Sequence, residues 1–163
     1  MPTAIEIEVK GLEELQKKKE QMITDLHGTP MLAAMRNATM LVTRDAMVLA
    51  PVDTGRLRAS ITPDVQLEDK TDVVGVVGSN VVYAPYMELG TGIPAGNPKV
   101  HWPPASALET WAKRHGTTGF LVARAIGLRG GLEPRRFLQK AFEQNQERIV
   151  EFIGTAVTKI VRK

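Results

Sequence analysis

The part of the sequence that decides the fold reads APVDTGRLRASITPDVQL, residues 50–67. Pro51 ends a long helical pattern, because proline disfavours the helical region for the residue that precedes it. After a polar turn that contains Gly55, apolar and polar residues alternate from 61 to 67, which is the period of a half-buried strand. The stretch therefore predicts a helix that ends in a sharp turn and leads into a β-sheet.

The sheet expected around this stretch is small and antiparallel. Residues 68–70 form a polar turn, and the apolar run that follows it indicates the second, more buried strand of a hairpin. Gly75 and Gly78 weaken the interior of that strand, so they suggest a bulge or a close approach of another backbone. We expect four strands, at residues 3–9, 59–67, 73–79 and 81–83.

Helical periodicity accounts for most of the remaining chain. The expected helices cover residues 11–26, 30–50, 105–115, 119–128 and 134–161. The helices at 30–50 and 134–161 are long enough to cover the sheet, and the pair within 105–128 forms an extra helical hairpin. The prediction is an α+β fold in a single domain, 1–163, with a small antiparallel sheet packed against two long helices.

A proline-rich loop is expected between residues 93 and 104. It contains four prolines and a glycine, a composition that forbids both a helix and a ladder of strand hydrogen bonds over a dozen residues. Loops of this length in a compact domain are usually binding elements or are locally disordered. We therefore expect the loop to protrude and to gain contacts from a partner.

Composition limits the class of protein. The chain has 163 residues, of which 43% are hydrophobic and 24% are charged, as in an average globular protein. It has no cysteine, which excludes thiol nucleophiles, cysteine-ligated zinc, iron–sulfur clusters and disulfides. No apolar run is long enough for a membrane span, and the first residues lack the pattern of a cleaved signal, so neither is expected.

The charge is distributed unevenly along the chain. Residues 1–80 contain nine basic and twelve acidic side chains, whereas residues 81–163 contain twelve basic and six acidic ones. Such a split suits subunits that meet head to tail, and it also suits contact between nucleic acid and the carboxy-terminal half. The pair of helices within 105–128 has the outline of a helix-turn-helix, so a DNA-binding regulator is the alternative function. Its second helix offers few side chains that read base edges, which favours a simple packed hairpin.

No catalytic, cofactor-binding or metal site is predicted. The three histidines, at 27, 101 and 115, lack the spacing of metal ligands, and no serine lies in a nucleophile elbow. Asp53 and Glu88 are the carboxylates that a hydrolase would use, and this is the weakest hypothesis. We expect Asp53 to accept backbone N–H groups in its own turn and Glu88 to pair with an arginine.

Three motifs together resemble the neck and tail-completion proteins of long-tailed bacteriophages. They are APVDTGRLRASI at 50–61, VGS at 77–79 followed by YAPYMELGTG at 83–92, and PRRFLQKA at 134–141. The chain departs from the family in two places. The stretch from 102 to 132 is longer than in compact members, and Arg135 and Arg136 stand between Pro134 and Phe137 where family members commonly have proline followed directly by phenylalanine. The residues that the resemblance assigns to the family motif or interface are Asp53, Thr54, Gly55, Arg56, Tyr83, Pro85, Tyr86, Glu88, Gly90, Thr91, Gly92, Trp102 and Phe137.

The resemblance implies a structural virion protein and no enzyme. Such a protein forms an oligomeric ring, six- or twelve-fold, in the head–tail connector or at the head-proximal end of the tail, and is needed for head–tail joining and tail completion. Its implied partners are other phage neck and tail proteins, with no cofactor and no membrane, and its location is the virion after assembly in the host cytoplasm. Nonspecific contact with passing DNA is expected from Arg124, Arg129, Arg135 and Arg136, since phosphate attraction does not depend on sequence.

Overall fold

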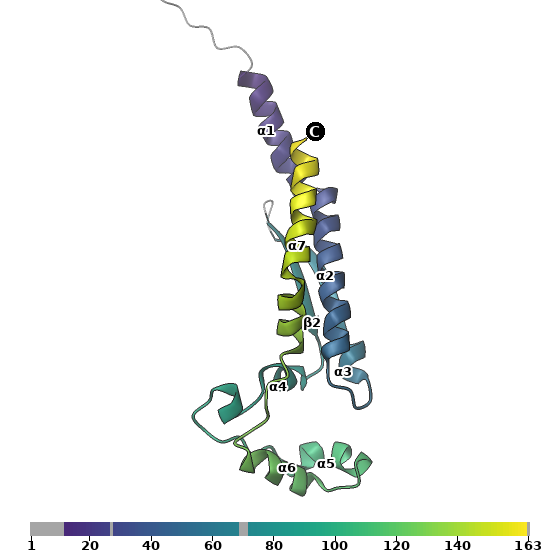
Figure 1. The fold of residues 1–163 in the computed structure, drawn as a ribbon, viewed down its shortest axis with the longest axis vertical. Coiled ribbons are helices and arrows are strands. Elements are labelled where there is room, and N and C mark those ends of the chain that lie inside the picture. Colours follow the sequence, from purple (N-terminus) through teal and green to yellow (C-terminus); the bar gives the residue numbers. More distant parts are fainter. Residues whose placement is uncertain (1–11, 27, 69–71, 163) are drawn as a thin grey trace, which may run out of the picture. The chain divides into compact units, whose positions relative to one another are not determined.

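The computed structural model describes residues 12–26, 28–68 and 72–162 (Figure 1). It confirms the α+β class, with a two-stranded antiparallel sheet and long helices. The elements in chain order are α1 (Leu12–Leu26), α2 (Thr29–Leu49), α3 (Arg56–Ala59), β1 (Ile61–Glu68), β2 (Asp72–Ser79), α4 (Ala84–Leu89), a 3-10 turn η1 (Ile93–Ala95), α5 (Ala105–Arg114), α6 (Gly119–Leu128) and α7 (Phe137–Val161).

The described sheet is smaller than the sequence predicts. The strand expected at 3–9 lies outside the described residues. The strand expected at 81–83 is wrong, because the chain turns there: the Ala84 N–H donates to the Val81 carbonyl at 2.9 Å, and α4 begins at once. Pro85, in the first turn of α4, has no N–H for a strand ladder and a backbone angle suited to a helix.

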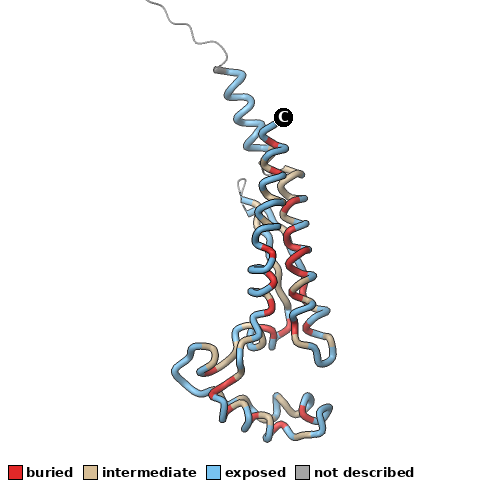
Figure 2. The backbone as a smooth tube through the Cα atoms, viewed as in Figure 1, coloured by how far each residue is buried: buried red, intermediate tan, exposed pale blue. Residues whose placement is uncertain are grey.

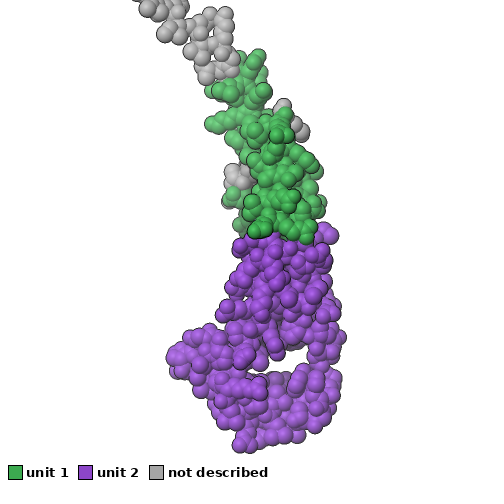
Figure 3. Space-filling view, in the orientation of Figure 1, with its two compact units in different colours: residues 1–39, 64–76, 147–163 green, residues 40–63, 77–146 purple. Residues whose placement is uncertain are grey.

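The described chain divides into two compact units (Figure 3). Unit 1 comprises Met1–Thr39, Asp64–Val76 and Glu147–Lys163, and unit 2 comprises Met40–Pro63 and Val77–Gln146. The uneven charge follows this division. The sequence of unit 1 has ten basic and twelve acidic residues, whereas that of unit 2 has eleven basic and six acidic ones.

In unit 1, one face of β2 lies against α2. A Cβ atom added to Gly75 would be 2.6 Å from Thr39 Cγ2 and 2.8 Å from Met35 Sδ, so only glycine fits without displacing them. The sequence predicts a bulge or a close backbone approach at both glycines. At Gly75 the close neighbours are side-chain atoms of α2, and a Cβ at Gly78 would meet nothing within 4 Å. Because side chains alternate along a strand, the residues on either side of Gly75 point away from α2.

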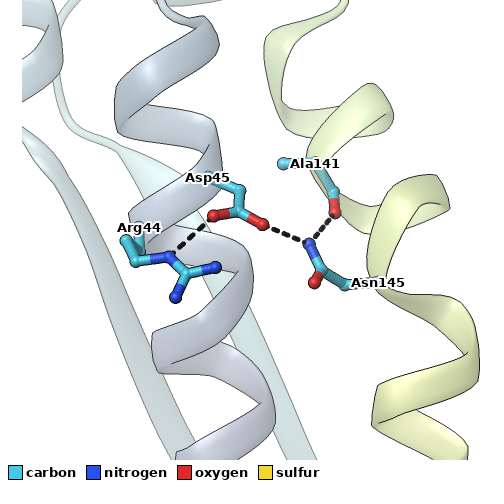
Figure 4. A network of polar contacts seen from close by, with 4 residues as sticks. All are labelled: Arg44, Asp45, Ala141 and Asn145. Atoms are coloured by element: carbon cyan, nitrogen blue, oxygen red, sulfur yellow. Dashed lines mark hydrogen bonds and ion pairs between the residues drawn. The ribbon is translucent and has the colours of Figure 1, made fainter.

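In unit 2, the carboxy-terminal half of α2 packs against the beginning of α7. Buried residues line both helices, as Figure 2 shows in red, and Phe137 at the start of α7 is 1% exposed. The buried Asn145 amide donates to Asp45 Oδ2 and to the Ala141 carbonyl, both at 2.8 Å (Figure 4). A hydrogen bond to a charged acceptor contributes about 1.5–3 kcal/mol. Asp45 also accepts from Arg44 Nε at 2.7 Å, and this bond, together with the charge of Asp45, raises the pKa of the Arg44 guanidinium.

Candidate interaction surface

The Gly90-Thr91-Gly92 motif forms a close crossing of two backbone segments. The Thr91 N–H donates to the Leu132 carbonyl at 2.8 Å, and the Leu132 N–H donates to Thr91 Oγ1 at 3.0 Å. A Cβ at Gly92 would be 2.0 Å from the Gly130 carbonyl oxygen, and one at Gly131 would be 1.9 Å from the Thr91 carbonyl oxygen. These glycines are therefore required by the approach of the two backbones.

The crossing holds both ends of the proline-rich loop. The Ile93 and His101 N–H groups donate to the same Gly130 carbonyl, at 3.0 Å and 3.1 Å. Within the loop, η1 occupies Ile93–Ala95, a short 3-10 turn where the sequence predicts no helix, and residues 96–100 are all exposed. The base of the loop is thus anchored while its middle part is accessible.

Glu88 connects the second motif to the third. Its carboxylate accepts the Leu138 N–H at 2.9 Å and the Gln139 N–H at 3.0 Å, so it caps the first turn of α7. A carboxylate at a helix N-terminus accepts hydrogen bonds from N–H groups that have no partner within the helix, and its negative charge is attracted to the positive end of the helix dipole. The expected pairing of Glu88 with an arginine side chain is replaced by these backbone contacts.

The same contacts explain where α7 begins. The Arg135 N–H donates to the Met87 carbonyl at 2.8 Å, and the Arg136 N–H donates to the Glu88 carbonyl at 3.1 Å. Arg136 has a φ of 52°, outside the helical region. The expected start of this helix at residue 134 is therefore three residues too early, since residues 135–136 are bonded to α4.

Asp53 of the first motif contacts the helical hairpin rather than its own turn. Its Oδ2 atom forms an ion pair with Arg114 Nη2 at the end of α5, and its Oδ1 atom lies 3.8 Å from His115 Nε2. The His115 ring stacks on Trp111, with 3.9 Å between ring centroids. Gly55, the residue before α3, has a φ of 81°, as its turn requires, while Thr54 and Arg56 are exposed.

No reaction chemistry is evident in these contacts. Glu88 caps a helix, and Asp53 links the turn before α3 to α5. Across the described ranges, no group of three or more histidine and acidic side chains is arranged to hold a metal ion. Both carboxylates named by the hydrolase hypothesis therefore have a structural role in these contacts.

Most aromatic side chains lie outside the core. All eight are in the described part of the chain, but only Phe137 is buried and Phe152 is half-buried. The other six are exposed and belong to unit 2: Tyr83, Tyr86, Trp102, Trp111, Phe120 and Phe142. Aromatic rings supply much of the binding energy of protein interfaces. Unit 2 thus presents side chains that are typical of an interaction surface.

The α5–α6 hairpin buries its small residues and exposes its large ones. The buried residues of α6 are Gly119, Ala123 and Gly127, spaced one turn apart. A Cβ at Gly119 would be 2.2 Å from the Ala105 carbonyl oxygen, and one at Gly127 would be 2.2 Å from the Trp102 ring. The exposed side of α6, here called the α6 outer face, consists of Phe120, Leu121, Arg124, Ala125 and Leu128.

This face is poorly suited to reading DNA sequence. Base edges are read by polar side chains such as Arg, Asn and Gln, whereas the α6 outer face carries a single arginine among apolar residues. All four arginines expected near DNA, Arg124, Arg129, Arg135 and Arg136, are exposed in unit 2. Among the described residues, none of them forms an ion pair.

Comparison with known proteins agrees with the motifs. Residues 13–90 match the family model described as "HK97-gp10_like: Bacteriophage HK97-gp10, putative tail-component", a range that includes the first motif and all but the last two residues of the second, and ends before the third. No curated protein and no solved structure matches the chain. No helix in the described ranges is long and apolar enough to cross a membrane. Over residues 13–90 the chain is therefore similar to the HK97-gp10-like family of bacteriophage tail components, which confirms the resemblance carried by its motifs and supports a structural role in a phage tail.

Proposed function

We propose that the chain is a structural subunit that forms a ring, six- or twelve-fold, in the phage neck or at the head-proximal end of the tail. In this position it joins head to tail and completes the tail. The observation that carries the proposal is the exposure of six of the eight aromatic side chains in a chain similar to tail components. Exposed aromatic side chains are typical of protein interfaces, and rings are built from contacts between unlike faces of identical subunits.

Other neck and tail proteins are the proposed partners of the proline-rich loop. The loop is anchored at its base by the Gly130 carbonyl, and its exposed residues 96–100 are free to meet a neighbour. An anchored loop loses less conformational entropy on binding than an unanchored one. The proposed location is the virion, reached by assembly in the host cytoplasm.

DNA is proposed as a nonspecific contact of Arg129, Arg135 and Arg136. These arginines lie in turns and extended segments of the basic unit 2, where phosphates can approach them. Arg124 differs, because the apolar residues of the α6 outer face surround it. A DNA phosphate that approached Arg124 would also lie against these apolar side chains, which is unfavourable for a charged group. We therefore assign Arg124 to a protein contact.

Particle assembly tests the proposed function. A phage that lacks this protein is expected to produce filled heads and separate tails, because the joining ring is absent, and electron microscopy of the lysate measures the fraction of joined particles. Supplying the intact chain from a plasmid should restore joining, and mass spectrometry should detect the chain in purified virions. Joined, infectious particles without the chain would contradict the proposal.

DNA retention separates the ring subunit from the regulator. Replacing Arg129, Arg135 and Arg136 together by Ala should weaken retention on duplex DNA for all sequences alike. The slope of the logarithm of the binding constant against the logarithm of the salt concentration should become shallower by about 0.9 per lost phosphate contact. The matched control replaces Lys17, Lys18 and Lys19 by Ala, which removes the same charge from the exposed surface of α1. A footprint on one defined site, lost in Arg124→Ala, would instead support a regulator that uses residues 105–128.

A further inference from the structure

The α6 outer face has a regular arrangement of apolar and basic side chains. Phe120 and Leu121 lie one turn before Arg124, and Leu128 lies one turn after it, so the arginine is flanked by apolar side chains on one stripe of the helix. Phe120 is 65% exposed and Leu128 is 71% exposed. The stripe is uncovered because the opposite side of α6 already packs within unit 2 through its glycines and Ala123.

The sheet in unit 1 has a face with acidic and apolar side chains, which complement the arginine and the apolar side chains of the α6 outer face. Ile61 is buried, so the even-numbered residues of β1 point away from the core, and Gly75 faces α2, so the even-numbered residues of β2 do the same. This outer sheet face, taken within unit 1, consists of Asp64, Gln66, Glu68, Asp72, Val74 and Val76. It has three carboxylates, two valines and no basic side chain among these residues.

We propose that the α6 outer face of one copy of this chain docks on the outer sheet face of the next copy in the ring. This inference rests on the proposed function and names the contact that would build the ring. Arg124 meets the carboxylates of the neighbour, and Phe120, Leu121 and Leu128 cover Val74 and Val76. The contact is heterologous, because it joins two different faces of the same chain, as ring formation requires.

Charge and size both favour a second copy as the occupant. Unit 2 has an excess of basic residues and unit 1 an excess of acidic ones, so unlike faces attract while like faces repel. The ten residues of α6 span roughly 15 Å, at about 1.5 Å per residue. The five residues from Asp64 to Glu68 span roughly 13–16 Å of strand. The helix and the strand segment therefore have matching lengths.

Cross-linking between single-cysteine variants tests this contact. The chain has no cysteine, so Ala125→Cys on the α6 outer face and Gln66→Cys on the outer sheet face introduce one reactive thiol each. Particles assembled from a mixture of the two variants, one of them enlarged by a tag, are treated with a short bis-maleimide. We expect a cross-linked pair that contains one subunit of each kind. Because each chain has a single thiol, such a product cannot arise within one subunit.

The control uses the neighbouring residue of the same strand. Leu67→Cys is exposed but points to the opposite face of the sheet, so it should give less than a tenth of the product that Gln66→Cys gives with Ala125→Cys. Equal products from both positions, or no product from either, would overturn the contact. If the chain is present in particles without this cross-link, only the contact fails. If the chain is absent from particles, the proposed function fails as well.

A charge exchange provides a second measurement. Arg124→Glu should lower the yield of joined particles at least tenfold, since it places a carboxylate against the acidic face of the neighbour. Adding Asp64→Lys and Glu68→Lys to that variant should restore the yield, whereas Arg58→Glu, an equal change at an exposed site of α3, should have little effect. Failure of the combined variant to recover while its thermal midpoint is unchanged would also refute the contact.

Discussion

Gly92→Ala is expected to destabilise unit 2 by about 4 kcal/mol, a large effect for so small an exchange. The added Cβ would lie 2.0 Å from the Gly130 carbonyl oxygen, so the crossing could not close. Gly92 also has φ 64° and ψ −144°, a backbone conformation that residues with a side chain hardly ever adopt. Urea unfolding measures the loss, and hydrogen exchange should show faster exchange of the Thr91, Ile93, His101 and Leu132 amides.

Gly96→Ala is the matched control in the same loop. Gly96 also has a positive φ, 82°, but a Cβ there would meet nothing within 4 Å. We expect a cost of about 1–2 kcal/mol, from the backbone conformation alone. Equal losses for the two variants would show that backbone conformation, and not the crossing, explains the requirement for glycine.

Phe137→Ala is expected to cost about 3–5 kcal/mol, because it removes a fully buried ring from the core of unit 2. The ring lies at the first residue of α7, so its loss should also loosen the helix start that Glu88 caps. Thermal and urea unfolding measure the effect.

Phe142→Ala, five residues later on the same helix, provides the comparison. That ring is 50% exposed, so its removal should change the free energy of unfolding by roughly 0.5 kcal/mol in either direction. If Phe142→Ala reduced stability as much as Phe137→Ala, the burial pattern of α7 would be wrong. If Phe142→Ala reduced particle joining alone, it would instead place Phe142 in an interface.

Local signals predict most of the helices. The predicted ends of α2, α5 and α6 lie within one residue of the observed ends. They follow from the helical repeat of apolar residues and from three local signals, Pro51, Gly116 and the Thr118 cap. The hairpin of β1 and β2 follows from alternation and from the polar turn between them. The short helices α3 and α4 are missed, because four to six residues are too few to show a helical repeat.

The contacts of the motif residues could not be derived from the sequence. Asp53 pairs with a residue 61 positions later, and Glu88 caps amides 50 and 51 positions later. Each carboxylate has nearer candidate partners in sequence, and only the path of the backbone decides which donor lies within reach. The glycines of residues 90–92 likewise look like an ordinary flexible turn until residues 130–134 are seen against them.

The sequence by itself determined the α+β class, the bounds of α2, α5 and α6 to within one residue, the absence of cysteine chemistry and the resemblance to phage tail proteins. Only the tertiary structure decided which side of α6 is buried. Nine of its ten residues are glycine or apolar, so hydrophobic periodicity does not distinguish one side from the other. The close approach of α5 and of Trp102 admits only small residues, and it therefore turns Phe120, Leu121 and Leu128 outward, where a partner can meet them.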